Sequence, residues 1–152
     1  MRIDLLADHV DLVPLIARWH YDEWSYYDPE RPLEDWTSRV AEMVNRDRIP
    51  IMFVAMEGDT LVGTASLVEF DMATRADLSP WLAGVFVDPE SRGQGTGTAL
   101  VRRVIDCAAD LGVSPLYLFT NGAEPLYERL GWKTFSSEHY RDRMVTIMTR
   151  PN

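Results

Sequence analysis

The stretch that decides the fold is VFVDPESRGQGTG, residues 85–97. An apolar strand at Val85–Val87 leads into a glycine-rich turn, and apolar side chains then recur at helical spacing from Gly97 to Leu111. The glycines of the turn let the backbone bend tightly and approach a ligand closely. Unpaired N–H groups at the start of a helix bind phosphate, and Arg92 adds a full positive charge. The stretch therefore predicts a diphosphate site between a strand and a helix.

Two familiar nucleotide motifs fit this loop poorly. A P-loop ends in Gly-Lys-Ser/Thr, and this loop has no lysine. A dinucleotide fingerprint needs Gly-x-Gly-x-x-Gly, but counted from Gly93 its third glycine position is Thr98. The next strand also ends in Thr120-Asn121 rather than in an acidic residue. A tight turn without a ligand is the structural alternative, and the flanking strand, helix and Arg92 make it the weaker one.

In the rest of the chain, segments with apolar residues at helical spacing are interspersed with segments typical of strands. Strands are expected at residues 2–6, 51–56, 61–70, 81–87, 116–120, 132–136 and 144–149, and helices at 11–24, from 32 to about 44, 97–111 and 123–130. Gly84 inside its strand suggests a bulge or a close approach of backbone. No linker is evident. This order predicts one α/β domain of the α+β type over residues 1–152, with a mixed sheet covered by helices.

Composition narrows the function classes. The chain has 152 residues, 46% hydrophobic and 26% charged, which suits a soluble globular protein. The net charge of −9 and the scattered basic residues disfavour nucleic acid, and no apolar run approaches the roughly 20 residues of a membrane helix. An acidic surface aids solubility and can attract cationic substrates. A single cysteine, Cys107, and no evident signal peptide lead us to expect a cytoplasmic location.

Two motifs carry a resemblance to a known family. The sequence Arg92-Gly93-Gln94-Gly95-Thr96-Gly97 fits the pattern Arg/Gln-x-x-Gly-x-Gly/Ala, and a strand at 116–120 precedes LYERLGW at 126–132. In both motifs, and in element order, the chain resembles the GNAT superfamily of N-acetyltransferases, most specifically from Trp81 to Trp132. One departure is the short connection Asn121-Gly122-Ala123, which puts the usual place of Asn121 near the cofactor in doubt.

The resemblance implies a mostly antiparallel, twisted sheet of about six or seven strands with about four helices, in which strands four and five splay apart. It implies acetyl-CoA as co-substrate, an amine acceptor, no metal and a possible homodimer. Tyr127 matches the general acid that protonates the departing thiolate, and a backbone N–H near Val85 would polarise the thioester carbonyl. The residues expected to hold the cofactor are Val85, Phe86, Val87, Arg92, Gly93, Gln94, Gly95, Thr96, Gly97, Thr98 and Asn121.

The acceptor and the general base stay open at this point. Glu69 is the first candidate for the base, with Asp71 beside it and Asp22 and Glu23 as alternatives. Residues 20–28 mix aromatic rings with carboxylates, which suits a cationic amine. Polyamines, aminoglycoside-like compounds, amino acids and protein N-termini all fit. A non-catalytic acyl-CoA sensor and an enzyme for longer acyl groups are the alternative functions.

Overall fold

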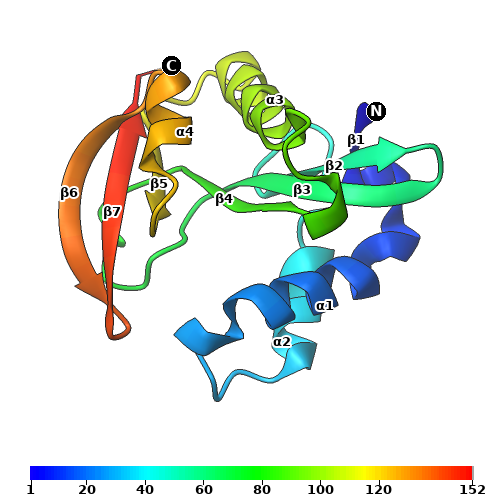
Figure 1. Cartoon of the computed structure of the whole chain (residues 1–152), viewed down its shortest axis with the longest axis horizontal. Coiled ribbons are helices and arrows are strands. Elements are labelled where there is room, and N and C mark those ends of the chain that lie inside the picture. The colour runs from blue at the N-terminus through cyan, green and yellow to red at the C-terminus, as the bar shows by residue number, and fades with distance from the viewer. Residues whose placement is uncertain (152) are drawn as a thin grey trace.

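The computed structural model describes residues 1–151 and has the expected order of elements (Figure 1). Within these residues the strands are β1 (Arg2–Leu5), β2 (Ile51–Glu57), β3 (Thr60–Val68), β4 (Trp81–Val87), β5 (Leu116–Thr120), β6 (Lys133–Tyr140) and β7 (Arg143–Arg150). The helices are α1 (Val13–Trp24), α2 (Leu33–Ala41), α3 (Thr96–Asp110) and α4 (Glu124–Arg129), with short 3-10 turns between some of them. The α/β fold class predicted from the sequence is confirmed.

One seven-stranded sheet organises the described residues, in the order β1-β2-β3-β4-β5-β7-β6. Neighbouring strands are antiparallel except β4 and β5, which are parallel and pair at Trp81 and Tyr117 alone. Beyond that point the two strands diverge, as Figure 1 shows. The predicted splay is therefore present, and it leaves the backbone of both strands unpaired along the gap.

The sheet separates two apolar layers. In β2 the side chains alternate: Met52, Val54 and Met56 face a core shared with α1 and α2, whereas Ile51 and Phe53 face a core shared with α3 and α4. All five are at most 2% exposed. The unbroken apolar run of β2 thus reflects a strand covered on both faces, and Figure 1 shows the two helix pairs on opposite sides of the sheet.

Several predicted boundaries shift. The strand expected at 61–70 ends at Val68, so Glu69 and Phe70 lie beyond it. The closing hairpin is longer than expected, because β6 continues from residue 136 to Tyr140. β6 is the edge of the sheet and its exposed side chains are mostly polar, so hydrophobic pattern gives no signal there. In β7, Met148 is fully buried in the core, whereas Met144 near the β6–β7 turn is 54% exposed.

Candidate active site

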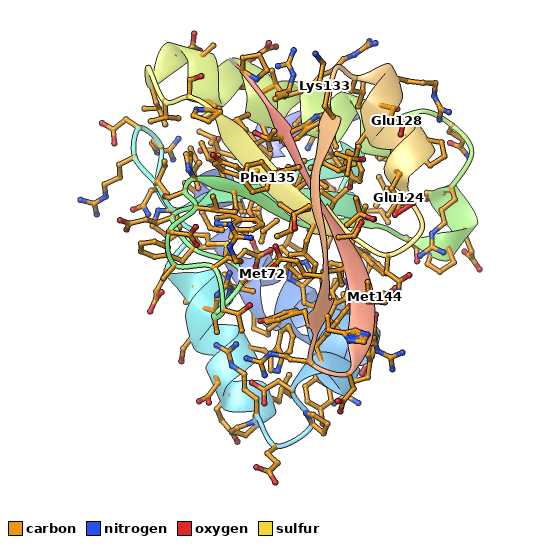
Figure 2. The ribbon with its side chains drawn as sticks, turned by 90° about the vertical axis from the view of Figure 1, so that its left-hand side faces the viewer. Met72, Glu124, Glu128, Lys133, Phe135 and Met144 are labelled. Carbon is orange, nitrogen blue, oxygen red and sulfur yellow. The ribbon has the colours of Figure 1, made fainter. Side chains whose placement is uncertain are left out.

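A cavity of about 370 Å³ opens where β4 and β5 part. One wall comes from β4 and β5, including Ala83, Val85 and Phe119, and the other from the segment that links α1 to α2. The turn between β6 and β7 closes a third side, since Arg141 forms an ion pair with Asp28 at 3.4 Å. In Figure 2 this hairpin reaches down to the two N-terminal helices. The cavity therefore joins the expected cofactor cleft to the part of the chain expected to hold the acceptor.

The bulge in β4 is fixed by side chains from β3. Gly84 has φ of +61°, and the pairing of β3 with β4 slips between Thr64 and Ser66. The hydroxyl of Ser66 donates to the carbonyl of Ala83, and that of Thr64 donates to the carbonyl of Gly84, each at 2.8 Å. The carbonyls displaced by the bulge thus have partners, and the predicted irregularity at Gly84 is confirmed.

His20 of α1 completes this arrangement. Its ring lies against the bulge, because a Cβ on Gly84 would come within 3.2 Å of Cε1 of His20. Burial, aided by the charge of Arg39, lowers the pKa of His20 to about 3. An imidazole with so low a pKa is a weak base at neutral pH. The position of His20 therefore suits a structural role at the cleft.

The glycine loop presents open backbone at the start of α3. Gly93 and Gly95 have φ of +78° and +82°, and a Cβ on either would meet no atom within 4 Å. The N–H of Ala99 bonds the carbonyl of Gly95, so the N–H groups of residues 96–98 precede the first bond within the helix. Nε of Arg92 donates to the carbonyl of Val87 at 2.9 Å, at the start of the loop. Open space, free donors and a positive charge together fit a diphosphate.

Tyr127 lies on α4 and lines the cavity, although only 7% of it is exposed. Burial raises the pKa of its hydroxyl to about 12, so the group stays protonated at neutral pH. The helix ends at Arg129, and the N–H groups of Leu130 and Trp132 just beyond it both bond the Tyr127 carbonyl. Asn121 also lines the cavity, while Figure 2 shows Glu124 and Glu128 on the same short helix. The site can thus offer a proton from Tyr127.

The carboxylates expected near the cleft separate in the structure. Glu69 is exposed and does not line the cavity, and Asp22 forms an ion pair with Arg18 at 3.2 Å, also outside it. Asp71 and Glu23 do line it. Burial raises the pKa of Asp71 to about 6, against the opposing charge of Arg39 3.3 Å away. Asp71 therefore combines a place in the cavity with a pKa near neutrality.

Three arginines that no sequence motif predicts lie around this cavity. Arg31, Arg39 and Arg141 line it together with the carboxylates Glu23, Asp28 and Asp71. Arg31 and Arg39 follow residues 20–28 in the chain, whereas Arg141 comes from the distant turn between β6 and β7. The acidic and aromatic segment was expected to suit a cationic amine, but the charges around the cavity are balanced.

None of the helices within residues 1–151 has the length and apolar character needed to span a bilayer. No three side chains of the metal-binding types gather at one point in this part of the chain. The expectation that no metal is involved stays a prediction.

The sequence is similar to known acetyltransferases. A family model described as "Acetyltransferase (GNAT) family" matches residues 13–132. Human N-acetyltransferase 8B is 35% identical over 103 residues, which cover 64% of this chain and 45% of that protein. The pig thialysine N-epsilon-acetyltransferase is 32% identical over 95 residues, 54% of this chain and 55% of its own length. The chain spans about half the length of these curated relatives.

Solved structures share the fold. An aminoglycoside 6'-N-acetyltransferase complexed with coenzyme A superposes with a TM-score of 0.78 at 19% identity, covering 99% of this chain and 97% of the other. A ribosomal-protein-alanine N-acetyltransferase from Brucella melitensis has a TM-score of 0.76 at 20% identity and full coverage of both chains. At such identities the likeness concerns the fold and leaves the acceptor open.

Proposed function

Because the chain belongs to the acetyltransferase (GNAT) family, we propose that it transfers an acetyl group from acetyl-CoA to a primary amine. The observation that carries the proposal is the cavity that the β4 bulge and Tyr127 line together, on the strand that leads into the open N-terminus of α3. Transfer would be direct, with both substrates bound at once, since one continuous cavity reaches from the cleft to the acceptor segment.

Acetyl-CoA would supply an activated acetyl group as a thioester. Its diphosphate fits the N–H groups of residues 96–98 and the charge of Arg92, with glycines leaving room for close approach. Its pantetheine arm fits the backbone of Val85–Val87 that the splay leaves unpaired. The contacts of Gln94 and Asn121 remain part of this proposal, as does the choice of acetyl over longer acyl groups.

The protein's part in the chemistry is to place three groups. The amine nitrogen attacks the thioester carbonyl, a C–N bond forms and the C–S bond breaks. The N–H of Val85 would donate to the developing oxyanion. Asp71 would accept the proton that the amine loses, and Tyr127 would give its proton to the departing sulfur. We prefer Asp71 to Glu69 as the base because it lines the cavity.

The acceptor is proposed only as an amine. The relatives named above act on thialysine, aminoglycosides or a ribosomal-protein alanine, which shows how widely acceptors vary on this fold. A homodimer and a cytoplasmic location are likewise expectations. The alternative function, an acyl-CoA sensor without turnover, would need the loop but not Tyr127.

The test has two parts. Acetyl-CoA and CoA should raise the melting temperature, because a ligand that binds the native state stabilises it, whereas NADH and ATP should do so much less. A panel of amines is then screened for release of free thiol from acetyl-CoA. Equal stabilisation by NADH would contradict the cofactor. Binding of acetyl-CoA without turnover on any amine would favour the sensor.

A further inference from the structure

The charged groups around the cavity are unequally paired. Among residues 1–151, Asp71 pairs with Arg39 and Asp28 pairs with Arg141. These two ion pairs account for two of the three carboxylates and two of the three arginines that line the cavity. Within the described part of the chain, neither Glu23 nor Arg31 has an ion-pair partner. One cation and one anion at the cavity are therefore left for a ligand.

Arg31 is held in place without being neutralised. Its backbone N–H bonds the carbonyl of Asp28 at 3.1 Å, and its guanidinium lies 5.4 Å from the ring centre of Trp36, which also lines the cavity. Stacking on an aromatic ring orients a guanidinium while leaving its N–H edge free for a carboxylate. Glu23 lies in the last turn of α1, eight positions earlier in the chain and in the same wall of the cavity.

A simple polyamine does not fit this arrangement. It would leave Arg31 without a partner and place like charges in one cavity, which costs free energy. A molecule with an ammonium and a carboxylate side by side would pair with both Glu23 and Arg31. The amine to be acetylated must reach Val85 and Tyr127, so it lies at the other end of a chain that passes the aromatic walls.

We propose that the acceptor is an amino acid with a second, terminal amine, whose carboxylate binds Arg31 and whose α-ammonium binds Glu23. This inference rests on the proposed function. The acetyl group moves from the sulfur of CoA to the terminal nitrogen, the proton of that nitrogen goes to the base, and the thiolate takes a proton from Tyr127. The products are the terminally acetylated amino acid and free CoA.

Four acceptors of matched length separate the two charges: lysine, lysinamide, 6-aminohexanoate and 1,5-diaminopentane. The first carries both charges, the second has an uncharged amide in place of the carboxylate, the third lacks the α-ammonium, and the last lacks the carboxylate group altogether but keeps both amines. We expect kcat/KM to be highest for lysine and roughly 10–100-fold lower without the carboxylate, as for the loss of a charge-assisted hydrogen bond. Mass spectrometry of the product should place the acetyl group on the terminal nitrogen.

The Arg31→Gln variant should lower kcat/KM for lysine by the same factor. The kcat/KM for lysinamide, which has no carboxylate for Arg31 to bind, should not change. Arg31→Lys should recover part of the loss because it keeps the charge. Arg143→Gln is the matched control, since Arg143 lies over Tyr26 and Tyr27 but does not line the cavity. Equal use of lysine and 1,5-diaminopentane, or turnover only with amines that carry no carboxylate, would overturn the inference and leave the proposed function standing. Binding of acetyl-CoA without transfer to any amine would overturn both.

Discussion

Nε2 of His20 lies 2.9 Å from Oγ1 of Thr64, and this contact joins helix α1 to the centre of the sheet. The Thr64 hydroxyl has one proton and gives it to the carbonyl of Gly84. The ring nitrogen of His20 must therefore donate, which fixes the neutral tautomer and agrees with the low pKa of this group. The wall expected to hold the acceptor and the bulge expected to hold the thioester are thus parts of one hydrogen-bonded unit.

Replacing Thr64 with valine should break this unit with little change in shape. The variant Thr64→Val leaves the Gly84 carbonyl and the N–H of His20 without partners, and Thr64 is fully buried. Each buried group left unpaired costs about 1–3 kcal/mol, so the free energy of unfolding in urea should fall by at least that amount. Thr64→Ser keeps the hydroxyl and is the control. A valine variant as stable as the parent would show that the contact contributes nothing.

The glycine loop needs a variant that separates ligand contact from backbone strain. Valine at Gly95 would be strained at φ of +82° whether or not a ligand binds, so lost binding there is ambiguous. Gly97 lies inside α3 without a positive φ, and a Cβ there would meet Val87 at an ordinary 3.6 Å. Gly97→Ala should therefore raise helix stability by about 0.5–1 kcal/mol.

The same Gly97→Ala variant should weaken binding of CoA by on the order of tenfold, about 1.4 kcal/mol, because its methyl group lies where the diphosphate is expected. Calorimetric titration with CoA measures the affinity, and thermal melting without ligand provides the control. If the variant melts higher and binds CoA as the parent does, the diphosphate does not approach Gly97.

The pH dependence of catalysis should identify the base. Asp71 accepts a proton only when ionised, and burial raises its pKa to about 6. As the pH falls through 6 the carboxylate is protonated, so kcat/KM should drop by about tenfold per pH unit below that value and level off above it. Asp71→Asn should abolish this fall of kcat/KM at low pH and lower the rate roughly 10²–10⁴-fold. Glu69→Gln is the matched control, and a larger loss from Glu69→Gln would return the role to that residue.

How much of this site the sequence could predict depends on how local each feature is. The run from Arg92 to Gly97 and the tyrosine of α4 lie within continuous motifs, so their positions follow from strand, turn and helix signals. The bulge at Gly84 was also local. These parts make up the expected cofactor side. Gly84 and Tyr127 line the cavity between β4 and β5, whereas the run from Arg92 to Gly97 lies at the start of α3 and is not among the residues that line it.

The acceptor side depends on tertiary contacts that no short pattern encodes. Glu69 and Asp71 lie two positions apart, just beyond the end of β3. There the alternation of a strand no longer decides to which side a side chain points. Only the path of the following segment, which pairs Asp71 with Arg39 of α2, decides which carboxylate reaches the cavity. Arg141 reaches it from the β6–β7 turn, in a strand pair whose length the hydrophobic pattern also missed.

Tyr127→Phe separates an enzyme with a tyrosine acid from the sensor alternative. The change removes one hydroxyl and keeps the ring, which packs against Trp132 with 6.2 Å between ring centres. Without the hydroxyl the thiolate must leave unprotonated or take a proton from water, so turnover should fall by roughly 10²–10⁴-fold. Burial raises the pKa of Tyr127 to about 12, so the parent protein carries this proton throughout the neutral range. Ionisation of Tyr127 should therefore not affect the pH dependence of the rate below pH 10.

Three measurements make the Tyr127→Phe result specific. The rate is followed by thiol release with the best acceptor of the screen, the affinity for CoA by titration, and the fold by the melting temperature. A large loss of rate with unchanged affinity and melting supports the acid role, because a packing residue would alter stability instead. Unchanged turnover would assign the proton to water or another group. If the parent itself binds acetyl-CoA yet acetylates no amine, the hydroxyl has no transfer to assist, and the sensor becomes the better account of the cavity around it.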